Sequence, residues 1–320
     1  SGYTPYEKLV IAKNHLIAKI LKQTGFPLPR IGASPITITV SDSAIMHLIE
    51  KYTNESGVRQ LERIIRSIAR KVVLRFKQDE IHTTNGVTIT EDNLQMYAGK
   101  PLIYPEQRFE KLPPGCVPMF AVSDTGGYFF YVEVALDHKR EHRKIKVTGV
   151  RASEISNTVN NVIEESIDVA LDSLVLEGGI LHQASEVREG ERDFYIHVHY
   201  SDFAVPKDGP SAGIPILWAL YGRLQNKSIP PNLGATGEID MVMGTIHRVG
   251  GIREKSLAAY RAGIKRFIIP EDNIRDLDEV PNEIKTEIEF LPKRSIWDAL
   301  LEAFPEDKLI LSYIESRRSS

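Results

Sequence analysis

The stretch that most constrains the fold is Pro206-Lys207-Asp208-Gly209-Pro210-Ser211-Ala212-Gly213, which lies between an expected strand and an expected helix. Residues 194–200 alternate as a half-buried strand does, and residues 214–223 form an apolar run of about two to three helical turns. Gly209 permits a sharp turn, and Pro210 suits the first turn of a helix. The order predicts that the Ser211 hydroxyl lies at a helix N-terminus, where backbone N–H groups favour developing negative charge.

A serine in this position has two interpretations. It is either a capping residue or a nucleophile, and a nucleophile needs a base to take its proton. The base is usually histidine, but a lysine in an apolar pocket can serve, and Lys255 ends the motif Gly250-Gly251-Ile252-Arg253-Glu254-Lys255. A free lysine is neutral in only roughly one molecule in a few thousand at pH 7. Lys255 must therefore be desolvated to act as a base; otherwise it is one of many solvated lysines.

These two motifs resemble those of the proteolytic domain of the Lon family of ATP-dependent proteases. Ser211 matches the family's nucleophile in K-D-G-P-S-A-G, and Lys255 matches its lysine in G-G-[aliphatic]-[basic]-E-K. The resemblance extends more loosely from Gly2 to about Phe304. It implies a serine endopeptidase with a Ser–Lys dyad, the proteolytic part of a protease that degrades unfolded or damaged proteins.

Three further residues are candidates for supporting the dyad. Thr236, in the segment Thr236-Gly237-Glu238, is expected to hydrogen-bond the lysine amine, although the segment also suits a strand with a tight bend. Asp208 is expected either to orient Lys255 or to cap the helix that begins near Pro210. Glu238 is a weaker candidate.

The segment Ile196-His197-Val198-His199 places two histidines on one face of the expected strand. Such a pair suggests metal ligands or a catalytic base, but no carboxylate follows at a diagnostic spacing and the dyad already supplies a base. The resemblance places the segment beside the active site as support. We favour packing and hydrogen bonding for His197 and His199, and we expect no metal site.

The composition narrows the remaining function classes. The chain has 320 residues, which is long enough for two domains. Its net charge of −3 gives no reason to expect nucleic-acid binding, although it does not exclude local basic patches. The single cysteine, Cys116, excludes an intrachain disulfide and favours a reducing compartment. No apolar run suggests a signal segment or a membrane span. We expect a fragment of a longer chain, because residue 1 is not methionine. We expect the protein to be cytoplasmic, or to lie in the mitochondrial matrix if the source is eukaryotic.

The predicted fold is a mixture of α+β and α/β architecture. Residues 1–100 are expected to form a small helical bundle with two short strands, and the proline-containing residues 101–114 a linker. Residues 115–310 are expected to form an α/β proteolytic domain with some parallel strands, followed by a polar tail over residues 311–320. Within that domain, a charged hairpin is expected to join the strands predicted over residues 128–135 and 144–148.

The segment Gly57-Val58-Arg59-Gln60-Leu61-Glu62-Arg63 looks like the sensor-2 motif of the small AAA+ domain in Lon proteases. By that resemblance Arg59 reaches the phosphates of a nucleotide; by itself it suits a solvated helix face. The phosphate-binding pattern G-x-x-x-x-G-K-[ST] occurs nowhere in the sequence. We therefore expect no ATP hydrolysis by this chain, with ATP and Mg²⁺ used only by a full-length protein.

The resemblance also has consequences for partners and specificity. It implies a homo-oligomer, a hexameric ring, acting on peptides or unfolded proteins. Val122 stands where Lon proteases usually have tryptophan, so cleavage preference does not carry over. Two other classes remain open: a non-enzymatic ring or scaffold module, and a DNA-binding protein, for which no feature rises above background.

Overall fold

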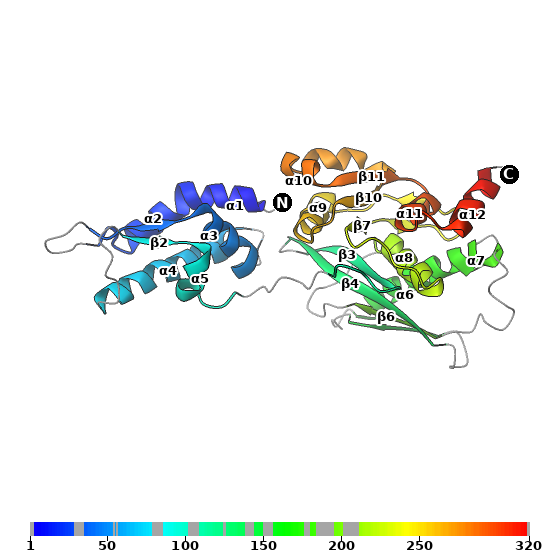
Figure 1. The fold of residues 1–320 in the computed structure, drawn as a ribbon, viewed down its shortest axis with the longest axis horizontal. Coiled ribbons are helices and arrows are strands. Elements are labelled where there is room, and N and C mark those ends of the chain that lie inside the picture. Colours follow the sequence, from blue (N-terminus) through cyan, green and yellow to red (C-terminus); the bar gives the residue numbers. More distant parts are fainter. Residues whose placement is uncertain are drawn as a thin grey trace. The chain divides into compact units, whose positions relative to one another are not determined.

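The computed structural model describes residues 3–28, 35–53, 55, 57–78, 86–101, 109–123, 126–137, 144–149, 156–175, 180–183, 195–200 and 211–318. The chain divides into two compact units: Ser1–Glu106 with Asp124–Gly126, and Gln107–Ser123 with Gly127–Ser320 (Figure 1). Each unit has its own hydrophobic core. Among the described residues, no helix combines the length and apolarity needed to cross a membrane. The fold therefore mixes helices and sheets, as the sequence predicted.

The first unit is mainly helical. Its helices are α1 (Pro5–Ile11), α2 (Ile17–Gln23), α3 (Asp42–His47), α4 (Arg59–Lys77) and α5 (Glu91–Ala98), with π-helical segments at Ala12–Leu16 and Leu48–Tyr52. Two of these helices have side-chain caps: the hydroxyls of Thr4 and Ser41 accept hydrogen bonds from the backbone N–H groups of Glu7 and Ala44. These local signals therefore place the helix starts.

A short parallel sheet completes the first unit. Strand β1 (Ile38–Val40) pairs in parallel with β2 (Val87–Ile89), and the apolar faces of the helices close over this pair. The amphipathic α4 buries Leu61, Ile65 and Val72 in the resulting core. The expected bundle with a two-stranded element is confirmed.

The second unit contains a four-stranded sheet in the order β3-β4-β6-β5. Its strands are β3 (Cys116–Ser123), β4 (Gly126–Asp137), β5 (Lys144–Thr148) and β6 (Tyr195–Tyr200). The expected hairpin of β4 and β5 is wrong, because β6 lies between them, antiparallel to β4 and parallel to β5. Strand β6 suits this central position because Ile196, Val198 and Tyr200 are all buried.

A second sheet in this unit is parallel. Its order is β11 (Glu289–Lys293), β10 (Arg266–Pro270) and β7 (Leu233–Ala235). The remaining elements here are α9 (Ile252–Arg261), the 3₁₀ helix η3 (Glu271–Glu279), α10 (Asn282–Glu287) and the antiparallel pair β8 (Glu238–Ile239) and β9 (Ile246–His247). The predicted parallel pairing is thus confirmed, and its strands alternate with helices.

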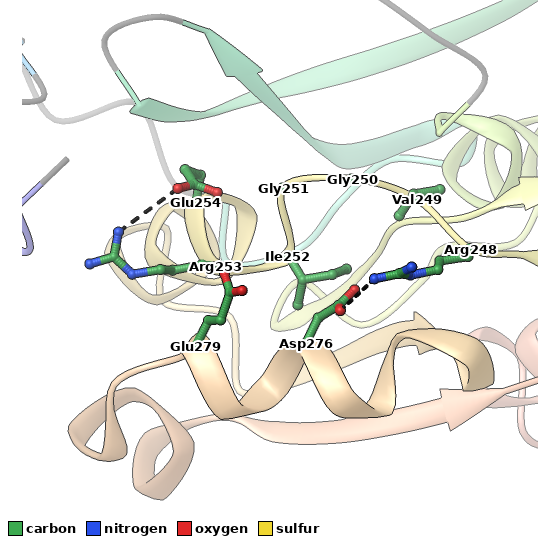
Figure 2. Close-up of a pocket in the computed structure, with 9 residues that line it drawn as sticks. All are labelled: Arg248, Val249, Gly250, Gly251, Ile252, Arg253, Glu254, Asp276 and Glu279. Atoms are coloured by element: carbon green, nitrogen blue, oxygen red, sulfur yellow. Dashed lines mark hydrogen bonds and ion pairs between the residues drawn. The ribbon is translucent and has the colours of Figure 1, made fainter. Parts of the chain in front are cut away.

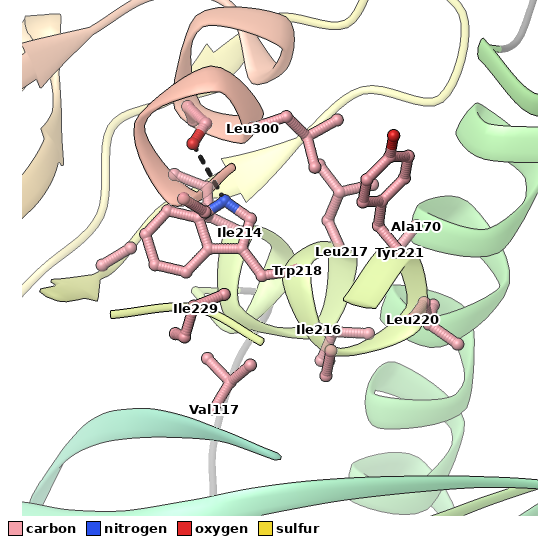
Figure 3. Close-up of a cluster of buried hydrophobic side chains, with 14 of the residues drawn as sticks. Val117, Ala170, Ile214, Ile216, Leu217, Trp218, Leu220, Tyr221, Ile229 and Leu300 are labelled. Carbon is pink, nitrogen blue, oxygen red and sulfur yellow. Dashed lines mark hydrogen bonds between the residues drawn. The ribbon is translucent and has the colours of Figure 1, made fainter. Parts of the chain in front are cut away.

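Helix α8 (Gly213–Leu224) follows Ser211 after one residue and is deeply buried. Residues 213–222 of this helix are all buried, and the Trp218 indole N–H donates to the Ala299 carbonyl at 3.0 Å (Figure 3). Around α8 lie further helices, α6 (Ser156–Val175), α7 (Ile180–Gln183), α11 (Ile296–Ala303) and α12 (Lys308–Arg318). A polar tail was expected over residues 311–320, but residues 311–318 form most of α12, which buries Ile310 and Tyr313.

Strand β10 separates two hydrophobic clusters of the second unit. Ile268 belongs to the cluster around α8, which we call the first cluster, together with residues of α11 and the four-stranded sheet. Phe267 and Ile269 point the other way, into a second cluster built on α9 and α10. Alternate side chains of a strand face opposite sides of a sheet, so the parallel sheet carries α8 on one face and α9 on the other.

Candidate functional site

Ser211 lies just before α8, beside the segment that follows β7. Ala212 forms a parallel bridge with Gly237, and the Ser211 carbonyl accepts a hydrogen bond from the Gly237 N–H at 3.0 Å. Gly213 is needed for this approach, because a Cβ there would lie 2.9 Å from the Ile239 side chain and 3.0 Å from the Gly237 carbonyl. The serine is therefore held at a helix start, half-buried. Asp208 lies outside the described residues.

Lys255 projects from the first turns of α9 into the protein interior. Its side chain is 4% exposed, and its Nζ donates to Thr236 Oγ1 at 3.0 Å. Burial lowers the pKa of Lys255 from 10.5 to about 8, because the charged amine has lost most of its hydration. A substantial fraction of the amine is thus neutral in mildly alkaline solution, which is the state that accepts a proton.

Thr236 connects the two motifs. It follows β7 directly, is almost fully buried, and its backbone N–H donates to the Ile268 carbonyl in β10. Its hydroxyl accepts the bond from Lys255 and donates to the Ser211 carbonyl at 3.3 Å. The serine motif and the lysine motif thus meet at the carboxyl end of the parallel strand β7. This end of a strand is a common location for ligand and active sites in open sheets.

The turn before α9, which we call the Gly250–Gly251 turn, positions the lysine. Gly251 has the left-handed φ of 72°, and a Cβ there would lie 2.6 Å from Val122 Cγ2. No side chain caps the helix, although the Lys255 N–H donates to the Gly251 carbonyl at 2.9 Å. Val122 therefore packs against the lysine motif.

A pocket of about 450 Å³ opens beside this turn (Figure 2). Its lining comes from the two residues before the turn, the turn itself, the start of α9 and η3, and consists of Arg248, Val249, Gly250, Gly251, Ile252, Arg253, Glu254, Asp276 and Glu279. The Arg248 guanidinium donates to Asp276 at 2.7 Å. Arg253 and Glu254 line this pocket, whereas Lys255 does not. The two charged side chains and the buried amine therefore face different parts of the protein.

The two histidines predicted to support the site share one partner. Thr148 Oγ1 lies 2.8 Å from His197 Nε2 and 2.8 Å from His199 Nδ1. Both rings are half-buried on the face of β6 opposite its apolar residues. A hydroxyl can donate to one imidazole and accept from the other, so this arrangement satisfies a neutral pair of rings. Among the described residues, no group of three or more His, Cys, Asp or Glu side chains is arranged to hold a metal ion.

The Lys255–Thr236 bond does not involve the two remaining predicted residues. Glu238 lies in β8, opposite His247. Arg59 belongs to the first unit, where it is the exposed first residue of α4. Sequence reasoning missed Thr148, which is an ordinary residue of an expected strand, and Asn273, a buried residue of η3 that binds the segment before the Gly250–Gly251 turn. No local sequence signal distinguishes either one.

The sequence matches two models of known protein families. Residues 88–306 match the model of the Lon protease (S16) C-terminal proteolytic domain, and residues 30–84 match that of the Lon protease AAA+ ATPase lid domain. The first match alone covers more than half of the chain and defines a serine peptidase. The chain belongs to the Lon protease family.

Curated relatives agree with the family models. The chain is 33% identical to a Lon protease of Methanosarcina barkeri over 307 residues, and 35% identical to one of Vibrio parahaemolyticus over 311 residues. These alignments cover 96% of the chain and 35% and 36% of the relatives. A mitochondrial Lon protease homolog of Caenorhabditis briggsae is 32% identical, with 90% of the chain and 32% of the relative covered. The chain spans about a third of the length of these relatives.

Proposed function

We propose that this chain is a serine endopeptidase in which Ser211 is the nucleophile and Lys255 the general base. The observation that carries the proposal is the buried Lys255 amine, bonded to Thr236, whose hydroxyl also bonds the Ser211 backbone. This geometry supplies what a Ser–Lys dyad requires, because the base is desolvated and is tied to the segment that carries the nucleophile.

The proposed reaction has two halves. Lys255 takes the Ser211 hydroxyl proton as the oxygen attacks the peptide carbonyl, and backbone N–H groups at the helix start stabilise the oxyanion. The C–N bond breaks and the leaving amine receives the proton from Lys255. In the second half Lys255 takes a proton from water as the water attacks the acyl-enzyme, and returns it to the Ser211 oxygen as the ester bond breaks. Thr236 accepts a hydrogen bond from the amine in both of its protonation states, so it holds Lys255 throughout.

Three kinds of supporting role are proposed for the other candidate residues. Thr236 positions Lys255, and Asp208 and Glu238 act on the dyad electrostatically. His197 and His199, tied to Thr148, support β6, the strand that precedes the serine motif. We propose no metal and no cofactor for the peptidase reaction itself.

The nucleotide dependence is proposed to lie outside this chain. Arg59 is exposed at the start of α4, where a sensor-2 arginine contacts a nucleotide bound by a large ATPase domain. ATP and Mg²⁺ then act only in a longer protein that has a phosphate-binding loop. This chain is expected to cut peptides and unfolded proteins, to form hexameric rings, and to work in the cytoplasm or, in a eukaryote, the mitochondrial matrix.

Hydrolysis of a fluorogenic peptide tests the dyad. Ser211→Ala is expected to lower kcat by on the order of a thousandfold or more while the chain stays folded. A fluorophosphonate probe is expected to label Ser211 in the wild-type chain, and the rate of labelling is expected to rise with pH through about 8, the pKa of Lys255. Lys285→Met, on an exposed position of α10, is the control. Near-normal turnover by Ser211→Ala would exclude Ser211 from the mechanism.

A further inference from the structure

A buried amide holds Val249, in the segment that leads into the lysine helix. Asn273, in η3, is fully buried, and its side chain bonds both backbone groups of Val249. The Val249 N–H donates to Asn273 Oδ1 at 3.0 Å, and Asn273 Nδ2 donates to the Val249 carbonyl at 2.8 Å. A side-chain amide can make this pair of bonds because it has both a donor and an acceptor.

The orientation of the amide is itself fixed. Asn273 Nδ2 also donates to Asp276, whose carboxylate accepts a hydrogen bond from Arg248 at 2.7 Å. Figure 2 shows Asp276 on η3 facing Arg248, next to Val249. Two successive residues, 248 and 249, are therefore tied to η3 by side chains that also bond each other.

The attachment at Val249 matters because the lysine motif comes directly after it. The next two residues form the Gly250–Gly251 turn, and α9 begins at Ile252 without a side-chain cap. The Lys255 N–H is bonded to Gly251, so the position of the turn sets the position of the lysine. Two glycines in succession restrict the backbone very little, and the restriction must come from neighbouring contacts.

We propose that Asn273 is a positioning residue for the peptidase reaction, acting through Val249 and the Gly250–Gly251 turn to hold Lys255 against Thr236. This inference rests on the proposed function, because it assigns Asn273 to the support of the proposed base. Asn273 is too far along the chain from either motif to have been part of them, and it reaches the base only through the backbone that it holds.

The position of the lysine governs its protonation. The amine is desolvated because the start of α9 holds it beside Thr236. Its charged neighbours in the first turn of α9, Arg253 and Glu254, line the pocket instead. When the turn loosens, water reaches the amine and the pKa of Lys255 rises from about 8 toward its value in water. Less of the base is then neutral at a given pH.

The test is the pH profile of peptide hydrolysis by Asn273→Leu, which removes both bonds to Val249 and keeps a similar volume. We expect the rising limb to move up by about one pH unit, with kcat/KM at pH 7 falling about tenfold through kcat and little change in KM. Asn273→Ser, a smaller change, is expected to move the limb in the same direction and covers the case in which the leucine variant does not fold.

Asp307→Ala is the matched control for stability. Asp307 is also buried and accepts hydrogen bonds from Tyr221, a residue of the first cluster, and from Lys227. Its carboxylate also accepts a backbone N–H bond at the start of α12 and so caps that helix. Its loss is expected to lower stability and leave the midpoint of the pH profile in place. If the Asn273 variants also keep the wild-type midpoint, or if Asp307→Ala moves it equally, Asn273 has a structural role only and the inference is overturned.

A second readout does not need peptidase activity. In a Ser211→Ala chain, the rate at which acetic anhydride modifies Lys255, followed by mass spectrometry as a function of pH, reports the neutral fraction of the amine. The midpoint is expected to rise on adding Asn273→Leu, and an unchanged midpoint would refute the positioning role. Hydrolysis that survives in Ser211→Ala would instead refute the proposed dyad, so the two failures are distinguishable.

Discussion

Replacing Lys255 by methionine is expected to stabilise the second unit while abolishing hydrolysis. The lysine is 4% exposed, and burial lowers its pKa from 10.5 to about 8. Each unit of pKa corresponds to about 1.4 kcal/mol, so keeping the charged amine buried costs about 3 kcal/mol. Methionine has a similar length and no charge. It loses the bond to Thr236, worth about 1 kcal/mol, so the net gain at pH 7 is about 2 kcal/mol.

The pH dependence gives this prediction its sign. The unfolded chain holds the lysine proton more tightly than the native chain, so the cost is complete below pH about 8. It decreases as pH rises, because the native amine becomes neutral while the unfolded one is still charged, and it vanishes above pH about 10.5. Wild-type stability therefore rises with pH across this window relative to Lys255→Met, which does not titrate.

Urea denaturation at pH 7 and pH 9.5 measures the difference. The only two tryptophans, Trp218 and Trp297, both lie in the second unit, so their fluorescence reports its unfolding alone. The exposed control Lys285→Met is expected to stay within about 0.5 kcal/mol of wild type at both pH values. A Lys255→Met chain that is less stable than wild type at pH 7, or whose advantage does not shrink by pH 9.5, would refute the account of a costly buried charge.

Two further predictions concern the turn and the assembly. Gly251→Ala is expected to destabilise the second unit by at least about 1–2 kcal/mol and to lower kcat, because residue 251 has a left-handed φ and its new Cβ would clash with Val122. In the same urea assay, adding Val122→Ala is expected to relieve the clash and leave the cost of the left-handed φ. Full recovery of stability in the double variant would show that the backbone contributes no cost. Sedimentation and peptide hydrolysis over one concentration range are expected to show activity rising as hexamers form; full activity in a monomeric sample would disprove that coupling.

Local sequence signals predicted the elements well because each one depends on a few neighbouring residues. Thr4 and Ser41 cap the helices that follow them, and the alternating stretch around Val198 forms a strand. The strand order was not predictable in this way. Whether β4 pairs with β5 or β6 depends on which partner buries its apolar face, and β6 is separated from β5 by the long helix α6. A short charged connection favoured a hairpin that the structure does not have.

The site divides along the same line. Ser211 and Lys255 could be proposed from the sequence because each lies in a compact motif, and Thr236 because it lies near one. Asn273 was not identifiable, because its partner Val249 is 24 residues away and an asparagine after a strand is typical of any turn. Side chains that act at a distance along the chain carry no pattern of their own, and only the packing of η3 against the turn reveals them.

Strand β10 has a consequence for local opening. Its alternation assigns α8, next to Ser211, to the first cluster and α9, with Lys255, to the second. Because α8 is buried on every side, its amides are expected to exchange with deuterium only when the whole unit unfolds. The second cluster is smaller, and α9 exposes Tyr260 and Arg261, so its amides are expected to exchange through smaller openings. We therefore expect local opening to displace Lys255, the proposed base, and return it without disturbing Ser211, the proposed nucleophile.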